Sequence, residues 1–314
     1  MRSAPDTVAV IGAGAIGGSW AALALAHGST VHVADPAPGV EARLRAAVAE
    51  HLNELDAGRA VLDRLTVHRD VADAARVADL VIEAGPERLE LKRELFATLD
   101  AAAPPDVVLA SSSSGFGPSA FQEACARPER VLVAHPFNPP HLIPLVEVVG
   151  GAHTSEDAVA ATMTAMRSLG RRPVRVRAEL PGHVVNRLQA ALWREAYDLV
   201  GRGVISVADL DYAVANGPGL RWALAGPIAT QHLSGGPGGL RHVLEHLGPP
   251  MLDWWADLGR PELTPELAER LVDGVEEEFD GREHEVLALR DRALRELLAV
   301  KARLGLDRPA GAGR

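Results

Sequence analysis

The chain has 314 residues, which is enough for two domains with a sizeable core. Its net charge is −10, from 42 acidic and 32 basic residues, which disfavours nucleic acid and anionic membrane surfaces as main partners. A single cysteine excludes an intrachain disulfide and cysteine-rich metal sites, and no metal is expected in the functional site. The start lacks a secretory-signal pattern and no run of about 18 apolar residues occurs, so we expect a cytoplasmic protein without a membrane span.

A glycine-rich turn near the start of the chain has the setting of a nucleotide site. Residues 8–11 predict an apolar strand, and Gly12, Gly14 and Gly17 follow at once in GxGxxG spacing. The next segments predict a helix and a second strand. Such glycines permit a tight turn, close approach of the backbone to pyrophosphate and close packing of helix on strand. Glycine-rich turns are common, but the register of strand, turn, helix and strand favours a dinucleotide here.

Asp35 closes the second strand, where an acid accepts hydrogen bonds from the adenosine ribose hydroxyls. A carboxylate at this place repels a 2′-phosphate, and residues 36–39 contain no arginine to receive one. NAD rather than NADP is therefore the predicted cofactor. The residues expected to contact it are Gly12, Gly14, Ala15, Ile16, Gly17, Asp35 and Ser112.

Strands and helices alternate through residues 1–181, which predicts an α/β domain of the Rossmann type with a doubly wound, mostly parallel sheet. Residues 41–65 are expected to be helical. The further strands are expected at residues 80–82, 107–110, 131–134, 145–149 and 173–176. Ligands of such sheets bind beyond the carboxyl ends of the strands, where the serine run 111–114 follows the fourth strand.

Residues 131–149 place His135 at the end of one apolar strand and Glu147 within the next. Burying an unpaired carboxylate is costly, and His135 is the nearest candidate partner for Glu147. A core histidine beside an edge-strand glutamate is the structural alternative for this pair.

The strand pattern stops after residue 181, and residues 182–306 predict an all-helical second domain. Its helices are expected at residues 183–201, from Ser206 onward, and at 227–247, 249–258, 264–279 and 284–303. Residues 307–314 are expected to be disordered. Taken alone, Asn186 is typical of a solvated residue in the first turn of a helix. Arg221, taken alone, is typical of a structural arginine that hydrogen-bonds helix-end carbonyls.

Together these residues suit hydride transfer from a secondary alcohol to NAD. His135 would accept the hydroxyl proton, and Glu147 would orient the imidazole and stabilise the imidazolium. Ser114 and Asn186 could hydrogen-bond the developing oxygen charge.

The chain resembles the L-3-hydroxyacyl-CoA dehydrogenase family between about residue 7 and residue 250. The resemblance rests on VAVIGAGAIGGSWA, ASSSSG, VAHPFNPPHLIPLVEVV, PGHVVNRLQ and GPGLRWALAGP. It implies that the catalytic group comprises Ser114, His135, Glu147 and Asn186. It also implies cofactor contacts near the nicotinamide for Glu87 and Lys92.

Within the family, the chain is similar to the branch of lambda-crystallin (L-gulonate 3-dehydrogenase) and L-carnitine dehydrogenase. This branch implies that Arg221 binds a substrate carboxylate, and that the helical domain forms a homodimer. Residues 36–60 contain no lysine, unlike the lysine-rich hairpin of acyl-CoA members, which favours a small free hydroxy acid or keto acid as substrate. Two alternatives stay open: a 3-hydroxyacyl thioester dehydrogenase or β-ketoreductase, and a non-catalytic, crystallin-like NAD-binding protein.

Overall fold

The computed structural model describes residues 4–307, which form two compact units divided between Arg187 and Leu188. The sequence alone suggested a boundary at Pro181, where the last strand pattern ends. Most of the tail expected to be disordered, residues 307–314, lies outside the described residues. Within the described part of the chain, no helix is long and apolar enough to cross a membrane. The cytoplasmic location stays a prediction.

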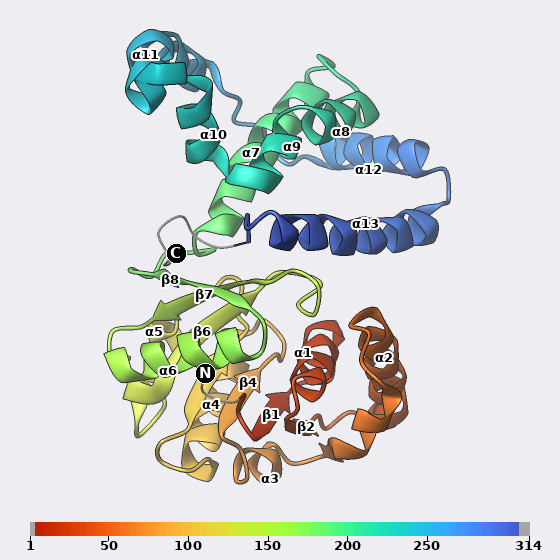
Figure 1. Ribbon diagram of the computed structural model, residues 1–314, viewed down its shortest axis with the longest axis vertical. Coiled ribbons are helices and arrows are strands. Elements are labelled where there is room, and N and C mark those ends of the chain that lie inside the picture. Colours follow the sequence, from red (N-terminus) through yellow and green to blue (C-terminus); the bar gives the residue numbers. More distant parts are fainter. Residues whose placement is uncertain (1–3, 308–314) are drawn as a thin grey trace. The chain divides into compact units, whose positions relative to one another are not determined.

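The first unit is built on an eight-stranded sheet (Figure 1). Its strands are β1 (Thr7–Ile11), β2 (Thr30–Ala34), β3 (Leu65–His68), β4 (Leu80–Glu83), β5 (Val108–Ser111), β6 (Val131–Pro136), β7 (Leu145–Gly150) and β8 (Arg172–Val176). They lie in the order β3-β2-β1-β4-β5-β6-β7-β8, and every neighbouring pair is parallel except β6 and β7. The predicted mostly parallel, doubly wound sheet is confirmed.

Helices cover both faces of this sheet, so each face has its own apolar core. The helices are α1 (Ala15–Ala26), α2 (Val40–Glu54), α3 (Val71–Ala75), α4 (Leu89–Ala102), α5 (Ser119–Gln122) and α6 (Glu156–Ser168), with short 3-10 turns η1 (Arg59–Arg64) and η2 (Pro128–Arg130). One core contains residues of α1, α2 and α6, and the other contains residues of α3, α4 and α5.

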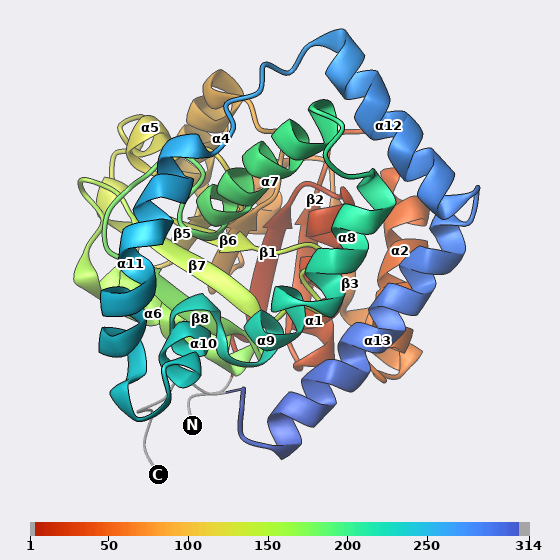
Figure 2. The ribbon, with the colours of Figure 1, turned by 90° about the horizontal axis from the view of Figure 1, so that it is seen from above.

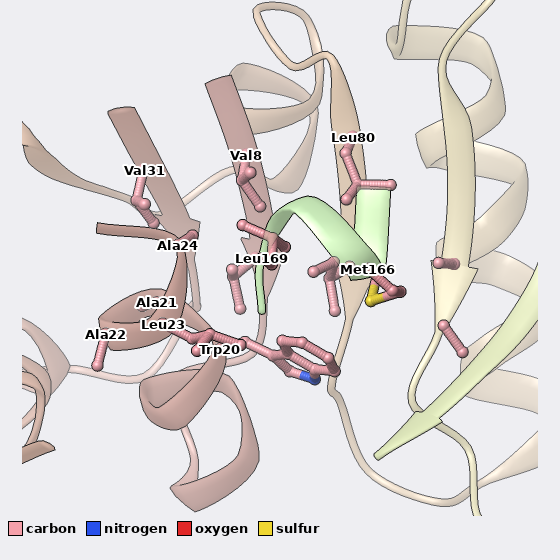
Figure 3. Packing of buried hydrophobic residues seen from close by; sticks show 14 of the residues in the cluster. Val8, Trp20, Ala21, Ala22, Leu23, Ala24, Val31, Leu80, Met166 and Leu169 are labelled. Atoms are coloured by element: carbon pink, nitrogen blue, oxygen red, sulfur yellow. The ribbon is translucent and has the colours of Figure 1, made fainter. Parts of the chain in front are cut away.

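Trp20 anchors α1 in the first of these cores and is fully buried. Figure 3 shows its ring close to Met166 and Leu169 of the α6 region, with Val8 and Leu80 from two strands nearby. Because α1 directly follows the glycine turn, this packing fixes the position of the turn at the carboxyl end of β1.

Strand β3 was not predicted, because Leu65–His68 directly follows a helical pattern. Only Leu65 of this four-residue edge strand is fully buried, so its local hydrophobic signal is weak. Pairing with β2 nevertheless satisfies its backbone on one side.

The second unit is helical, as predicted. Its helices are α7 (Val185–Gly201, which begins in the first unit), α8 (Val207–Asn216), α9 (Pro218–Ala225), α10 (Pro227–Ser234), α11 (Gly239–Asp257), α12 (Pro265–Phe279) and α13 (Glu283–Arg303). Ser206 caps α8 by accepting the backbone N–H of Asp209, as the capping-box pattern indicates. Figure 2 shows α8 leading into α9 and α10 into α11.

The helices between residues 227 and 258 differ from expectation in two respects. The helix expected over 227–247 is broken at the glycine-rich turn η3 (Gly236–Gly238), because Gly236 and Gly239 adopt positive φ. The next helix, α11, then continues through Pro249 and Pro250, where the sequence suggested a break.

Candidate active site

The three glycines of GxGxxG have three different surroundings. A Cβ on Gly12, which has φ of +105°, would lie 2.6 Å from Ala84 O, and one on Gly17 would lie 1.9 Å from Gly12 O. These two positions therefore require glycine for the turn itself. A Cβ on Gly14 would meet no atom within 4 Å from other described residues beyond its chain neighbours, so the space beside it is open. An open, side-chain-free N-terminus of α1 fits a pyrophosphate group.

Asp35 lies beside this open space at the end of β2. Its Oδ2 accepts the N–H of Ala13 at 2.9 Å, and its Oδ1 accepts the N–H of Ala37 at 2.9 Å. The carboxylate is thus held against the glycine turn in a fixed orientation. This position suits recognition of ribose hydroxyls and disfavours a 2′-phosphate, so the residues present fit NAD.

A buried ion pair lies under the carboxyl ends of β4 and β5. Lys92 of α4 donates to both carboxylate oxygens of Glu83 at 2.9 Å, and both side chains are 1% exposed. The Ser111 hydroxyl also donates to Glu83. Lys92 lies 3.4 Å from Glu87 Oε2 as well, so its ammonium group holds two carboxylates. Direct contact between Lys92 and the cofactor stays a prediction.

Glu87 is the half-exposed member of this network and connects it to the serine run. It accepts hydrogen bonds from Ser113 Oγ at 2.6 Å and from the N–H of Gly115 at 2.9 Å. Burial by itself would raise the pKa of the Glu87 carboxyl. The two hydrogen bonds and Lys92 outweigh burial, so this pKa lies below its ordinary value. Glu87 is therefore a fixed negative charge that orders the loop after β5.

His135 and Glu147 are directly paired residues of the antiparallel strands β6 and β7. His135 Nδ1 lies 3.0 Å from Glu147 Oε2, and both side chains are buried. The other carboxylate oxygen of Glu147 accepts the N–H groups of Val184 and Val185 at 3.0 and 3.1 Å. Burial would raise the pKa of Glu147, but the hydrogen bonds from His135, Val185 and Val184 outweigh it and lower the pKa.

The ionised Glu147 decides the tautomer of His135. A carboxylate can only accept hydrogen bonds, so Nδ1 of His135 must carry the hydrogen that it shares with Glu147. Nε2 of a neutral His135 then keeps its lone pair. The arrangement can take a proton at one defined nitrogen, which is the property of a general base.

His183 is a second buried histidine whose ring centroid lies 5.2 Å from that of His135. Its Nε2 lies 3.0 Å from the Ser113 carbonyl oxygen and therefore donates to it. Its buried Nδ1 has no hydrogen-bond partner among the described residues, and its φ is +51°. Burial lowers the pKa of His183 below its ordinary value and so favours the neutral ring, in which Nδ1 is a hydrogen-bond acceptor.

Ser114 and Asn186 also meet in the first unit. The side-chain amide of Asn186 donates to the Ser114 carbonyl oxygen at 3.4 Å. Ser112 lies two residues before Ser114 in the chain, and its hydroxyl accepts the Trp20 indole N–H at 3.1 Å. Arg221 lies on α9 of the second unit and is exposed. Its role toward the substrate stays a prediction.

The sequence reasoning did not single out Glu83, Ser113 or His183 as parts of this site. Glu83 ends a buried strand in the same way that Glu147 interrupts one, so its apolar setting was a usable signal. Ser113 binds Glu87 through its hydroxyl and His183 through its carbonyl. Sequence spacing does not reveal these two contacts, because Ser113, Glu87 and His183 lie in three separate segments that meet only in the folded chain.

A cradle for a dinucleotide and a His–Glu pair at the same sheet edge define an NAD-dependent dehydrogenase that acts on a CH–OH group. Residues 7–179 match the 3-hydroxyacyl-CoA dehydrogenase NAD binding domain, and residues 182–273 match the C-terminal domain of that enzyme. The chain belongs to the 3-hydroxyacyl-CoA dehydrogenase family.

Individual relatives cover nearly the whole chain. L-carnitine dehydrogenase of Streptomyces coelicolor is 47% identical over 303 residues, which are 95% of each chain. A 3-hydroxyacyl-CoA dehydrogenase of Gibberella moniliformis is 44% identical over 317 residues, covering 97% of this chain and 98% of that one. The solved structure of 5-formyl-3-hydroxy-2-methylpyridine 4-carboxylic acid 5-dehydrogenase, an NAD+-dependent dismutase, has a TM-score of 0.76 at 32% identity and covers 96% of this chain and 98% of its own.

Proposed function

We propose that this enzyme oxidises the 3-hydroxyl group of L-carnitine to the 3-keto product, with His135 as the general base. The identity of 47% over 95% of both chains with an L-carnitine dehydrogenase is the observation that carries the choice of substrate. The buried pair of His135 and Glu147 supports the chemistry.

In this mechanism His135 Nε2 accepts the hydroxyl proton of the substrate, since Nδ1 is occupied by Glu147. Bound NAD supplies the acceptor for the hydride that leaves the same carbon. Glu147 stabilises the imidazolium that results, and the two backbone N–H groups of Val184 and Val185 hold Glu147 in place. The proton then returns to water when the product has left.

Ser114 and Asn186 are assigned to the substrate oxygen. The Asn186 amide donates a hydrogen bond to the backbone carbonyl of Ser114, which holds the Asn186 side chain next to residue 114. Hydroxyl and amide hydrogens aimed at the oxygen stabilise its negative charge as it forms.

The segment after β2 supports a small substrate. This segment holds only the helix α2 (Val40–Glu54) and the short turn η1 (Arg59–Arg64), and residues 36–60 contain no lysine to bind the phosphates of coenzyme A. L-carnitine carries a carboxylate, and Arg221 is assigned to it because a guanidinium matches a carboxylate in charge and geometry.

The relative from Gibberella moniliformis favours a second candidate, a 3-hydroxyacyl thioester. The deciding experiment is a panel of L-carnitine, L-gulonate, 3-hydroxybutyrate and its CoA thioester, followed by NADH absorbance. The proposal expects the highest kcat/KM for L-carnitine. A higher kcat/KM for the thioester would replace L-carnitine by that substrate class, and NAD binding without turnover of any compound would favour a non-catalytic role.

We also propose a homodimer formed through the helical unit. Large apolar side chains are exposed along its helices; examples are Leu188, Leu220, Ile228, Leu233, Leu252, Trp254 and Trp255. Monomeric proteins rarely expose so much apolar surface. Light scattering coupled to size exclusion should give twice the chain mass of 33.2 kDa, whereas a mass of one chain would contradict the proposal.

A further inference from the structure

A second cluster of polar side chains lies in the first unit, where α2 faces the connection between β6 and β7. It consists of His51 and Glu54, one turn apart on α2, and His141 from the connection. One nitrogen or oxygen atom of each residue lies within 4.8 Å of those of the other two. None of these residues belongs to the proposed catalytic or cofactor groups.

The geometry inside the cluster brings two imidazoles to one carboxylate oxygen. Glu54 Oε2 makes a short contact with His141 Nε2 and lies 3.5 Å from His51 Nδ1. Tetrahedral Zn²⁺ with bonds of about 2.0–2.1 Å places its ligand atoms roughly 3.3 Å apart. The separation of His51 and Glu54 is therefore close to that of two ligands of one ion.

His51 Nδ1 is the feature that a purely structural cluster leaves unexplained. It is buried and has no hydrogen-bond partner among the described residues, although the side chain as a whole is 23% exposed. Its ring stacks on that of His141, with centroids 4.1 Å apart. A buried nitrogen without a hydrogen bond is costly, and an ion at this place would use its lone pair.

Ser19 of α1 contacts His141, the third residue of the cluster. The Ser19 hydroxyl oxygen accepts the backbone N–H of His141 at 2.8 Å and lies 2.7 Å from its Nδ1. This contact fixes the ring so that Nε2 points at Glu54, as the outer partners of metal-bound histidines do. Ser19 is 1% exposed, so the Ser19–His141–Glu54 series has no access to a substrate and is not a hydrolytic triad.

We propose that His51, Glu54 and His141 form a binding site for a divalent transition metal ion, with Zn²⁺ as the best fit. Two neutral imidazoles and a carboxylate are ligands that Zn²⁺ prefers, and a water would complete four-coordination. On binding, the imidazole hydrogen of His141 moves from Nε2 to Nδ1, where Ser19 Oγ accepts it. The ion then replaces the hydrogen between His141 and Glu54.

Such a site would join α2 to the connection that separates His135 from Glu147. The sequence did not predict it, because Glu54 and His141 are 87 positions apart. The ion is assigned a stabilising role, since neither the catalytic pair nor the glycine turn supplies a ligand.

The test is Zn²⁺ titration of the full-length, metal-free protein against a chromophoric chelator. The wild type should bind one Zn²⁺ per chain, and bound Co²⁺ should give the intense visible absorption of four-coordination. H51A should lower the affinity at least about 100-fold, and its fold should be intact because His51 Nδ1 has no hydrogen-bond partner in the described part of the chain. S19A should lower the affinity about 10- to 100-fold, as loss of an outer partner does.

The matched control is H32N. His32 and His68 form another histidine pair in the same unit, with Nδ1 2.8 Å from Nε2. This variant should bind Zn²⁺ as the wild type does. The proposal would be overturned if H51A and E54Q bound Zn²⁺ as tightly as the wild type does. It would also be overturned if the wild type bound Zn²⁺ more weakly than exposed histidines do. Circular dichroism and NADH binding of each variant separate loss of the site from loss of the fold.

Discussion

His135 and Glu147 face each other across β6 and β7, with Nδ1 3.0 Å from Oε2 and the second carboxylate oxygen held by two backbone N–H groups. The strand register alone aligns them, since the two residues are direct partners in the ladder. Their burial keeps water from competing for the carboxylate, so Glu147 holds the His135 ring in one orientation.

The first prediction concerns the tautomer. In Glu147→Gln the amide oxygen should keep the N–H groups of Val184 and Val185, which turns the amide NH₂ toward His135. Nδ1 must then become the acceptor, and Nε2 carries a hydrogen and cannot act as base. We expect kcat to fall about 10³- to 10⁴-fold while the Kd for NADH is unchanged. A kcat within about tenfold of the wild type would show that Glu147 does not set the tautomer.

The base itself is tested by His135→Ala. Loss of a general base costs about 10²- to 10⁴-fold in rate, and the cofactor cradle does not include this ring. Turnover of L-carnitine should therefore nearly vanish, while NADH fluorescence titration gives the wild-type Kd. His153→Ala, at an exposed histidine of the same unit, is the control and should keep full activity.

Substitutions of Gly14 and Gly17 should separate cofactor binding from folding. Gly14→Ala adds a methyl group where no protein atom lies within 4 Å, so the melting temperature should be unchanged while the Kd for NAD rises roughly tenfold or more. Gly17→Ala forces a methyl group onto Gly12 O and should cost about 1–3 kcal/mol of stability. Equal effects of both changes on stability would contradict the assignment of Gly14 to the pyrophosphate.

His183 should make stability depend on pH in a defined window. Burial lowers its pKa below the ordinary value of about 6.5, so the unfolded chain takes up a proton that the folded chain resists. Its contribution is complete above about pH 6.5 and is lost as the pH falls below that value. The free energy of unfolding of His183→Asn, measured by urea denaturation, should fall less steeply between about pH 6.5 and pH 5.5 than that of the wild type.

Asparagine suits this comparison, because it tolerates the positive φ and can donate to the Ser113 carbonyl. Burial and His68 also lower the pKa of His32. His32 therefore keeps part of the pH dependence of stability in the His183→Asn variant. Glu147 and Glu87 affect stability at more acidic pH, because their carboxyls protonate only as the pH falls through their lowered pKa values. An unchanged slope in His183→Asn would show that His183 does not carry this effect.

Arg221→Ala should raise the KM for L-carnitine and leave the KM for NAD unchanged. Loss of a charge-assisted contact costs about 1.5–3 kcal/mol, which is roughly 10- to 150-fold in KM. Arg241→Ala, at an exposed arginine of α11, is the control. If the two variants behave alike with L-carnitine, Arg221 does not bind the carboxylate.

Local pattern was sufficient for several of these features. The GxGxxG turn, the acid at Asp35 and the apolar strands other than β3 were predictable, because each depends on neighbouring residues and on the period of a strand or helix. His135 and Glu147 were recognisable as a pair, because only one short connection separates their strands.

The tertiary structure decided what depends on distant segments. Local spacing does not reveal that Lys92 pairs with Glu83 or that α2 meets His141. It also does not reveal that His183 Nδ1 has no hydrogen-bond partner among residues 4–307. Packing of the helices on the two faces of the sheet determines which polar groups are buried together. The sequence by itself thus determined the class of fold, the cofactor and the pairing of His135 with Glu147. The fold decided which buried charges and imidazoles share one environment, because burial and long-range proximity arise only when the chain has packed.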